Sequence, residues 1–479
     1  MSFRQSNMRI VILAEVVLAI GFYCLIELIE VRALRLKHLI FISSIAIMFF
    51  SGLLGREKYT IYFLFAVLSF YANPFRVEIF FGLSCYLILA LSLGMFAKNN
   101  PFGNSSQNDD GISLIKKWLL FFLFLSIVLP FLSDSYNPFV HPGMMASYAN
   151  FVCFVIIVIL FIDIIPKDIE MIEKLMFIFN LSVFVHLLSY LSMRLSLPLI
   201  PSFLTTGSSE STDQYRFMGL MRDYELIVDY LITVIGFSMW MIYYNKHRIF
   251  SFAFMGTAFI LGFLSGTRSF FVTCILLLMV NTSLVLLKSG SRKKIIISLI
   301  FVIIVAVVFV YAEGMEIFRP VFDRAQDSIY AIQHGQIELA ANRQWSEAIP
   351  VVIEKAGLLG HGAFLCGHFY DHVMVPHCLY LDMYSKFGLL GIVALVFLFF
   401  KMSKMSYKIG SGEFILFSTV ITLAVHQSKI SALRNIESML IYTFLFTAIY
   451  VLHKKPRDRM YFKNTKQDKR QWPVLRLQS

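Results

Sequence analysis

The sequence has 479 residues, of which 58% are hydrophobic and only 15% are charged. Repeated apolar blocks of about 20 residues are typical of transmembrane helices, and a soluble domain cannot bury so much apolar surface, so a soluble protein is excluded. The net charge of +12 does not indicate a nucleic-acid-binding protein, because membrane proteins gather lysine and arginine in their cytoplasmic loops and tails.

Apolar blocks long enough to cross a bilayer occur along most of the chain. The first is expected to be a retained helix, because no small-residue cleavage site of a signal peptide follows it. The blocks cover residues 8–29, 39–54, 59–71, 77–96, 118–132, 144–164, 169–195, 226–244, 249–264, 270–287, 295–311, 378–400, 414–424 and 439–452. They predict an all-α polytopic membrane protein with about 12 to 14 transmembrane helices and a large extracytoplasmic helical loop.

These blocks and the polar segments between them divide the chain into five regions. Residues 1–195 form an N-terminal transmembrane bundle, and residues 196–314 contain helices, the first outer loop and an arginine motif. Residues 315–376 form the large outer loop, and residues 377–453 form the C-terminal transmembrane helices. The basic segment 454–479 is expected to be a cytoplasmic tail.

Short basic loops set the orientation, because lysine and arginine beside transmembrane helices stay in the cytoplasm. The basic positions are Lys246, Arg248, Arg292, Lys293, Lys294, Lys401, Lys404 and Lys408. An even number of helices then leaves both termini cytoplasmic and the long polar segments 196–225 and 313–376 outside. Arg32, Arg35 and Lys37 oppose this scheme, since they lie on its outer side.

The predicted outer side is rich in arginine, which opposes the usual tendency and requires an explanation. The outer arginines are Arg216, Arg222, Arg268, Arg319, Arg324, Arg343 and Arg434. Arginine stays charged and presents a planar fork of N–H donors that suits phosphate oxygens. Convergence of three separate segments on one diphosphate would explain the excess. The alternative is that these arginines reach lipid headgroups or form local salt bridges, such as Arg343 with Glu347.

The second outer segment is expected to contain an amphipathic helix over residues 337–355. Arg343 and Glu347 share one face of this helix, and apolar residues share another. The apolar residues are Ile337, Ala341, Trp345 and Ala348. Pro350 should kink the helix and Gly357 should end it, while the apolar face lies on the membrane surface.

After this helix, Gly360 and Gly362 allow a tight turn before His377, which stands at the mouth of the next apolar block. Near neutral pH, a histidine at this place can take a proton from an acceptor hydroxyl as that hydroxyl attacks. A histidine that only hydrogen-bonds a nearby loop is the alternative. The rival candidates for the base are Glu347, Asp371 and Asp382.

A metal site and a disulfide are further alternatives for this segment. The potential metal ligands are His361, His368, Asp371 and His372, with Cys366 and Cys378. Their spacing fits no standard zinc pattern, so no metal is predicted. Cys366 and Cys378 could form a disulfide if the loop faces an oxidising compartment. The sequence has no Gly-rich phosphate loop, so the substrate is not expected to be a cytoplasmic nucleotide sugar.

His377 is followed by Cys378, nine further residues and G-L-L-G, which contains Gly388 and Gly391. This pattern resembles the histidine motif of bacterial O-antigen ligases, in which His is followed by Asn, Ser or Gln, nine residues and G-x-x-G. Cys378 stands where the family has an amide or a hydroxyl.

Three further segments are similar to the same superfamily and occur in the same order. R-F-M-G-L-M-R-D-Y-E-L, which starts at Arg216, is similar to its R-x-x-G-x-x-x-[DN] segment. S-G-T-R-S around Arg268 resembles its S-x-S-R helix start, and R-Q-W at Arg343 before a G-x-G turn resembles its outer-loop helix. The resemblance covers residues 216–391.

The resemblance implies a GT-C-like fold and an inverting glycosyltransferase that needs no metal or other cofactor. Such enzymes take a glycan from undecaprenyl diphosphate at the periplasmic or outer face of the bacterial inner membrane. It further implies that three arginines hold the diphosphate and that His377 assists attack by the acceptor. The arginines are Arg216, Arg268 and Arg343. Apart from the resemblance, Arg222, Glu347 and Asp382 are candidates for supporting residues. Arginines that neutralise the diphosphate can make it a good leaving group, as magnesium does in other enzymes.

Length and helix count favour a repeat-unit polymerase, which extends another carrier-linked repeat. The histidine motif favours a ligase, which transfers the glycan to lipid A core, and a protein O-oligosaccharyltransferase is a third member. The expected partners are the undecaprenyl-diphosphate-linked glycan, the bilayer and a chain-length regulator or another polysaccharide-assembly protein. A flippase or transporter of lipid-linked glycans is the candidate from another class, although transporters usually place charge at the bilayer midplane.

Overall fold

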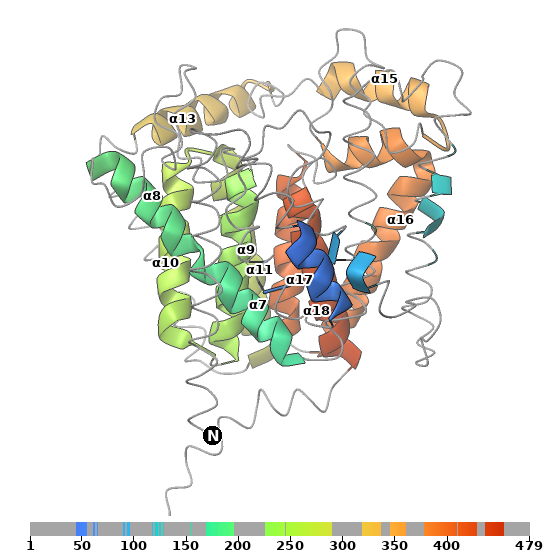
Figure 1. Cartoon of the computed structure of the whole chain (residues 1–479). Helices are drawn as coiled ribbons and strands as arrows, with labels where there is room; N and C mark the ends of the chain where they lie inside the picture. Colours follow the sequence, from blue (N-terminus) through green and yellow to red (C-terminus); the bar gives the residue numbers. More distant parts are fainter. Residues whose placement is uncertain are drawn as a thin grey trace, which may run out of the picture.

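The part of the chain that the computed structural model describes is built from α-helices, as the sequence predicts. The described residues are 45–54, 61, 62, 65, 90, 91, 93–95, 117, 120–122, 124, 125, 128, 155, 169–195, 226–244, 246–289, 319–336, 345–360, 378–409, 411–428 and 436–454. The helices labelled in Figure 1 are α7 (Ile169–Leu181), α8 (Val183–Leu195), α9 (Leu226–Tyr243), α10 (Arg248–Leu264), α11 (Arg268–Ser289), α13 (Arg319–Gln333), α15 (Trp345–Ala356), α16 (Leu379–Ile409), α17 (Ser411–His426) and α18 (Ile436–Lys454).

Three stretches of the described chain are long and apolar enough to cross a membrane. They are Glu170–Leu191, Leu226–Tyr243 and Leu379–Ser406, and shorter apolar helices accompany them. These helices indicate a helical membrane protein. Most of the apolar blocks before residue 169, and the block 295–311, lie outside the described residues, so the predicted total of spans stays a prediction.

The long helices run alternately between two ends of the molecule, which we call upper and lower as they stand in Figure 1. At the lower end, the Tyr244 hydroxyl just after α9 donates to Glu413 Oε1 at the start of α17, over 2.8 Å. Helices α13 and α15 lie across the upper end (Figure 1). Lys246, which forms an ion pair with Glu173 of α7, lies at the lower end, whereas Arg268 begins α11 at the upper end. This arrangement matches the alternation that the sequence predicts.

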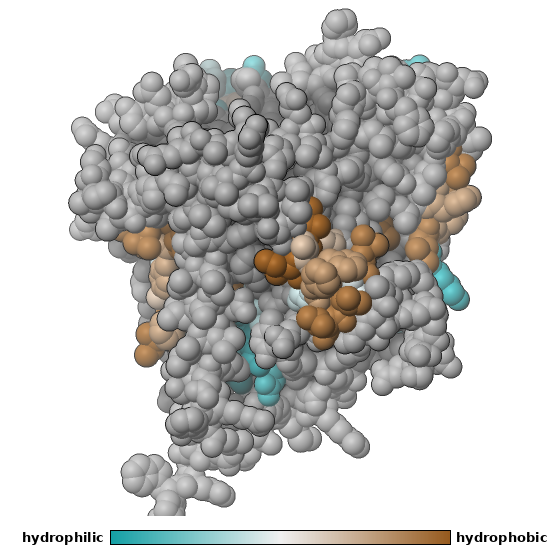
Figure 2. All heavy atoms as spheres, in the orientation of Figure 1, coloured by the Kyte–Doolittle hydropathy of each residue, from teal (hydrophilic) through white to brown (hydrophobic). Residues whose placement is uncertain are grey.

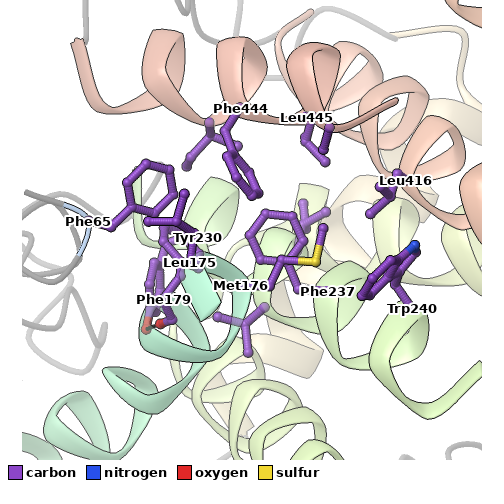
Figure 3. Close-up of a cluster of buried hydrophobic side chains, with 14 of the residues drawn as sticks. Phe65, Leu175, Met176, Phe179, Tyr230, Phe237, Trp240, Leu416, Phe444 and Leu445 are labelled. Carbon is purple, nitrogen blue, oxygen red and sulfur yellow. Dashed lines mark hydrogen bonds between the residues drawn. The ribbon is translucent and has the colours of Figure 1, made fainter. Parts of the chain in front are cut away.

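Helix α9 lies at the centre of the bundle and is buried on all sides, as expected of a helix that is apolar all round. The Phe237 ring lies 5.4 Å from the Phe444 ring and 5.5 Å from the Phe179 ring, so α9 joins α18 to α7 (Figure 3). A Cβ atom on Gly236 would lie 2.1 Å from Thr419 Oγ1 of α17. Small residues that allow such close approach are typical of helix contacts in membranes, where packing rather than water exclusion holds helices together.

Large apolar side chains cover the outward flanks of the bundle (Figure 2). They include Ile249, Phe252 and Ile260 on α10, Val272, Ile275 and Met279 on α11, and Leu389, Val393, Val396 and Phe397 on α16. A soluble monomer rarely exposes so many large apolar side chains. The flanks therefore suit contact with lipid tails.

The structure differs from the sequence-based expectation in two places. The block 169–195 is broken at Ser182, whose hydroxyl donates to the Phe179 carbonyl and contacts the Tyr230 hydroxyl. A serine that bonds to its own backbone competes with the regular helix ladder. The outer segment also contains α13, which the sequence analysis left without a helix. Pro320 at the second position of α13 is a usual helix start signal.

Helix α15 corresponds to the described part of the helix predicted over residues 337–355. Pro350 lies inside it, and the predicted kink stays a prediction. Gly357 follows directly with φ of 56°, a left-handed conformation that favours glycine, so the predicted stop is confirmed. Gly360 has φ of 72° and makes the predicted tight turn, while Gly362 lies outside the described residues.

This turn packs backbone to backbone against α16. The Leu389 amide donates to the Leu358 carbonyl over 3.0 Å. Gly388 interrupts the helical conformation of α16 with φ of 60° and ψ of −150°, and a Cβ atom there would lie 2.1 Å from the Leu358 oxygen. A Cβ atom on Gly360 would lie 2.5 Å from the Phe387 nitrogen. We call this contact between residues 358–360 and 386–389 the glycine clasp.

Replacing Gly388 by alanine should destabilise the protein, because the new methyl group meets a fixed carbonyl and the backbone has positive φ. We expect the thermal unfolding midpoint in detergent to fall clearly, with a loss of about 2 kcal/mol or more. Gly256→Ala on α10 is the matched control, because a Cβ atom there has nothing within 4 Å. Equal midpoints for the two variants would contradict the clasp.

Candidate functional site

Most residues of the predicted site lie outside the described part of the chain. They are His377, Arg216, Arg222 and Arg343, and their roles stay predictions. The backbone of the three others is described: Arg268 begins α11, Glu347 lies in the first turn of α15, and Asp382 lies in the first turn of α16. The structure therefore shows the segments that carry or adjoin the predicted site.

The turn before Arg268 is tight and internally bonded. Gly266 has φ of 61°, and its amide donates to the Phe263 carbonyl over 3.1 Å. The Ser265 hydroxyl donates to the Gly262 carbonyl over 2.7 Å and accepts the Thr267 amide over 3.3 Å. The predicted turn between two helices is thus confirmed, and it fixes the direction in which α11 starts.

The start of α16, directly after His377, is held by the end of α17. The Leu379 amide donates to the Gln427 carbonyl over 2.8 Å, and the Tyr380 hydroxyl donates to the Ala424 carbonyl over 3.0 Å. Cys378 is buried as a thiol and is not part of a disulfide. Cys366, the other cysteine considered for a disulfide, lies outside the described residues.

Asp382, predicted as a supporting residue or rival base, is buried in an ion pair within its own helix. Lys386 Nζ lies 3.2 Å from Asp382 Oδ2, and their side chains are only 2% and 5% exposed. A buried carboxylate needs such a partner to offset its loss of hydration. The contact gives Asp382 a structural task next to the glycine clasp.

A second buried polar group joins α9 to α17 and was not singled out in the sequence. Asp229 is 1% exposed and lies in the first turn of α9. Its Oδ1 accepts from His426 Nδ1 over 2.8 Å, and its Oδ2 accepts from Gln427 Nε2 over 2.5 Å. We call these three residues the Asp229 cluster. The carboxylate fixes the orientation of the imidazole, as a carboxylate does beside catalytic and metal-binding histidines.

The sequence contained one signal for this cluster. An acidic residue in the apolar block 226–244 is expensive in a membrane, and such residues usually mark a functional site. Its partners could not be identified, because His426 is 197 positions away and lies just past the predicted end of its own block. Among the described residues, no three His, Cys, Asp or Glu side chains gather as metal ligands.

No protein-family model matches the chain, and no curated protein is significantly similar to it. The residues themselves and their arrangement at the upper end are therefore the basis for a functional conclusion.

Removing the Asp229 carboxylate should destabilise the upper end, because two buried donors, on His426 at the end of α17 and on Gln427 just after it, lose their acceptor. We expect Asp229→Ala to lower the free energy of unfolding by about 3 kcal/mol. Asp327→Ala on the exposed surface of α13 is the control and should change it by less than about 0.5 kcal/mol. Similar thermal stabilities for both variants would show that the cluster does not hold the helices together.

Proposed function

We propose that the protein is a repeat-unit polymerase of O-antigen or a related polysaccharide. It would be an inverting, metal-independent glycosyltransferase that moves a glycan from undecaprenyl diphosphate to a carrier-linked acceptor repeat. Its site would face the periplasm or cell exterior at the inner membrane. In this proposal, Arg216, Arg268 and Arg343 bind the diphosphate and His377 assists attack by the acceptor hydroxyl.

The observation that carries the proposal is that the described neighbours of the motif residues share the upper end. Arg268 begins α11 there, α15 begins two residues after Arg343, and α16 begins two residues after His377. Helix α9, which follows the segment with Arg216, starts at the same end, because Asp229 in its first turn bonds to His426 at the end of α17. The helices that follow these four motifs in the sequence thus begin at one end of the bundle or lie across it, which supports a shared site there.

The distribution of buried charge supports an enzyme over a transporter. The buried acidic side chains in the described part of the chain are Asp229, Asp382 and Glu413, and each lies in the first turn of its helix. The buried Lys386 lies one turn further along α16 and is paired with Asp382. Transporters place their coupling and substrate sites near the bilayer midplane, often on discontinuous helices, whereas the interruption of α16 at Gly388 packs against the turn after α15 at the upper end. Charges at helix ends suit a site at the membrane surface, where a lipid-linked diphosphate and a water-exposed acceptor can meet.

Two arguments explain how such a site would work without a metal. Guanidinium groups form bidentate bonds to phosphate oxygens and neutralise the charge that develops as the glycosidic C–O bond breaks. A histidine at the membrane surface can take the proton of the attacking hydroxyl. An O-antigen ligase, or a protein O-oligosaccharyltransferase, would use the same chemistry with another acceptor, and a lipid-linked glycan flippase would need none of it.

Loss of a diphosphate-binding arginine should abolish product formation. We expect Arg268→Ala or Arg343→Ala to lower the rate at least about 100-fold, because developing charge is left unneutralised. The lysine variants should recover only part of it, since a point charge cannot span two oxygens. The measurement is polymer length from purified protein and a carrier-linked repeat, with Lys401→Ala at an exposed position as control. Full-length polymer from an alanine variant would remove that arginine from the site.

The same assay tests the reaction class. Chelators should leave the rate unchanged, because arginines replace the metal. Inhibition that added magnesium or zinc reverses would instead support a metal site. Flipping of the lipid-linked repeat in liposomes, without any longer glycan, would refute the polymerase and favour the flippase.

A further inference from the structure

Three buried polar atoms without a hydrogen-bond partner lie on residues of the upper end, two of them in the Asp229 cluster. They are His426 Nε2, Gln427 Oε1 and the Tyr442 hydroxyl, and none has a partner among the described residues. Gln427 bonds to Asp229 beside His426, and its carbonyl accepts the Leu379 amide. Tyr442 of α18 packs against Leu379. The three atoms therefore lie where the upper parts of α9, α16, α17 and α18 meet.

Such a group of atoms is unusual in a folded protein. A buried polar atom that lacks a partner costs about 1–3 kcal/mol, so native structures contain few of them. The other polar atom of two of these side chains already has a partner, because His426 Nδ1 and Gln427 Nε2 donate to the Asp229 carboxylate. Three unused atoms on residues at one junction of helices indicate a site that a polar ligand completes.

The hydrogen-bonding character of the atoms defines the class of ligand. A carboxylate only accepts, so Gln427 donates from Nε2 and leaves Oε1 as an acceptor. His426 donates from Nδ1, and its neutral form leaves Nε2 as an acceptor. The Tyr442 hydroxyl can donate and accept. Two acceptors and one hydroxyl suit a ligand that offers O–H donors, which a phosphate or diphosphate at neutral pH does not.

We propose that His426, Gln427 and Tyr442 form a subsite that binds hydroxyl groups of the acceptor glycan. The inference rests on the proposed function and adds that the donor and the acceptor bind to different residues of the upper end. Arginines would bind the anionic diphosphate of the donor, and the Asp229 cluster with Tyr442 would bind the neutral sugar of the acceptor. His377, two residues before the start of α16, would lie between the two substrates.

Two variants remove the unused atoms and keep the structural contacts. Tyr442→Phe deletes only a hydroxyl that has no partner, so the thermal unfolding midpoint should stay equal or rise. His426→Asn deletes Nε2 but keeps an amide N–H close to the position of Nδ1, so the bond to Asp229 can persist. Ser406→Ala is the matched control, because it removes another buried, unpartnered hydroxyl near the lower end of α16.

The experiment measures polymerisation by the purified full-length protein while the concentration of the carrier-linked acceptor repeat is varied. We expect Tyr442→Phe and His426→Asn to lower kcat/KM for the acceptor about 10- to 100-fold, with unchanged thermal midpoints. Ser406→Ala should keep the wild-type kcat/KM.

Wild-type kcat/KM for both variants would overturn the subsite and leave only bound water as the partner of these atoms. An equal loss of kcat/KM in Ser406→Ala would also overturn the subsite, because the loss would then not depend on where in the molecule the hydroxyl lies. If the variants are active while Arg268→Ala is inactive, the proposed function stands and only this inference fails. If the wild-type protein makes no polymer from the carrier-linked repeat, the proposed function and the subsite fail together.

Discussion

Asp229 holds the upper end of the molecule together by accepting hydrogen bonds from His426, the last residue of α17, and from Gln427, which follows it. The bonds fix the start of α9 against the end of α17 and orient the His426 ring. Gln427 extends the connection, because its carbonyl accepts the Leu379 amide at the start of α16. A carboxylate buried at this depth is stable only with such partners, so three helices depend on one side chain.

The glycine clasp is the second constraint on the same end. It joins the turn after α15 to α16 through the Leu358 carbonyl and the Leu389 amide, and it needs glycine at 360 and 388. Together the Asp229 cluster and the clasp fix the chain on either side of residues 361–377, at Gly360 and at Leu379. The proposed site thus rests on two contacts made by residues that are not themselves proposed to react.

The sequence predicts much of the helical framework, because long apolar runs between basic turns are a strong local signal. Helices α9, α10, α11, α16, α17 and α18 occur where apolar blocks are expected, and Gly357 ends α15 as predicted. The helix α13 is missed because it is polar overall. The partners of Asp229 and the break at Gly388 depend on contacts between distant segments. A glycine motif indicates that glycine is needed, but only the packed structure shows that the Leu358 carbonyl occupies the space of a side chain at Gly388.

The clasp also has a consequence for how this surface can diverge. Its atoms belong to the main chain, so α15 and the turn after it can exchange most side chains without losing their alignment on α16. Only Gly360 and Gly388 cannot be replaced freely, because a Cβ atom at either position would overlap backbone atoms. Side-chain substitutions in α15 and the turn after it can therefore change which ligands this surface binds without changing how the segment packs on α16.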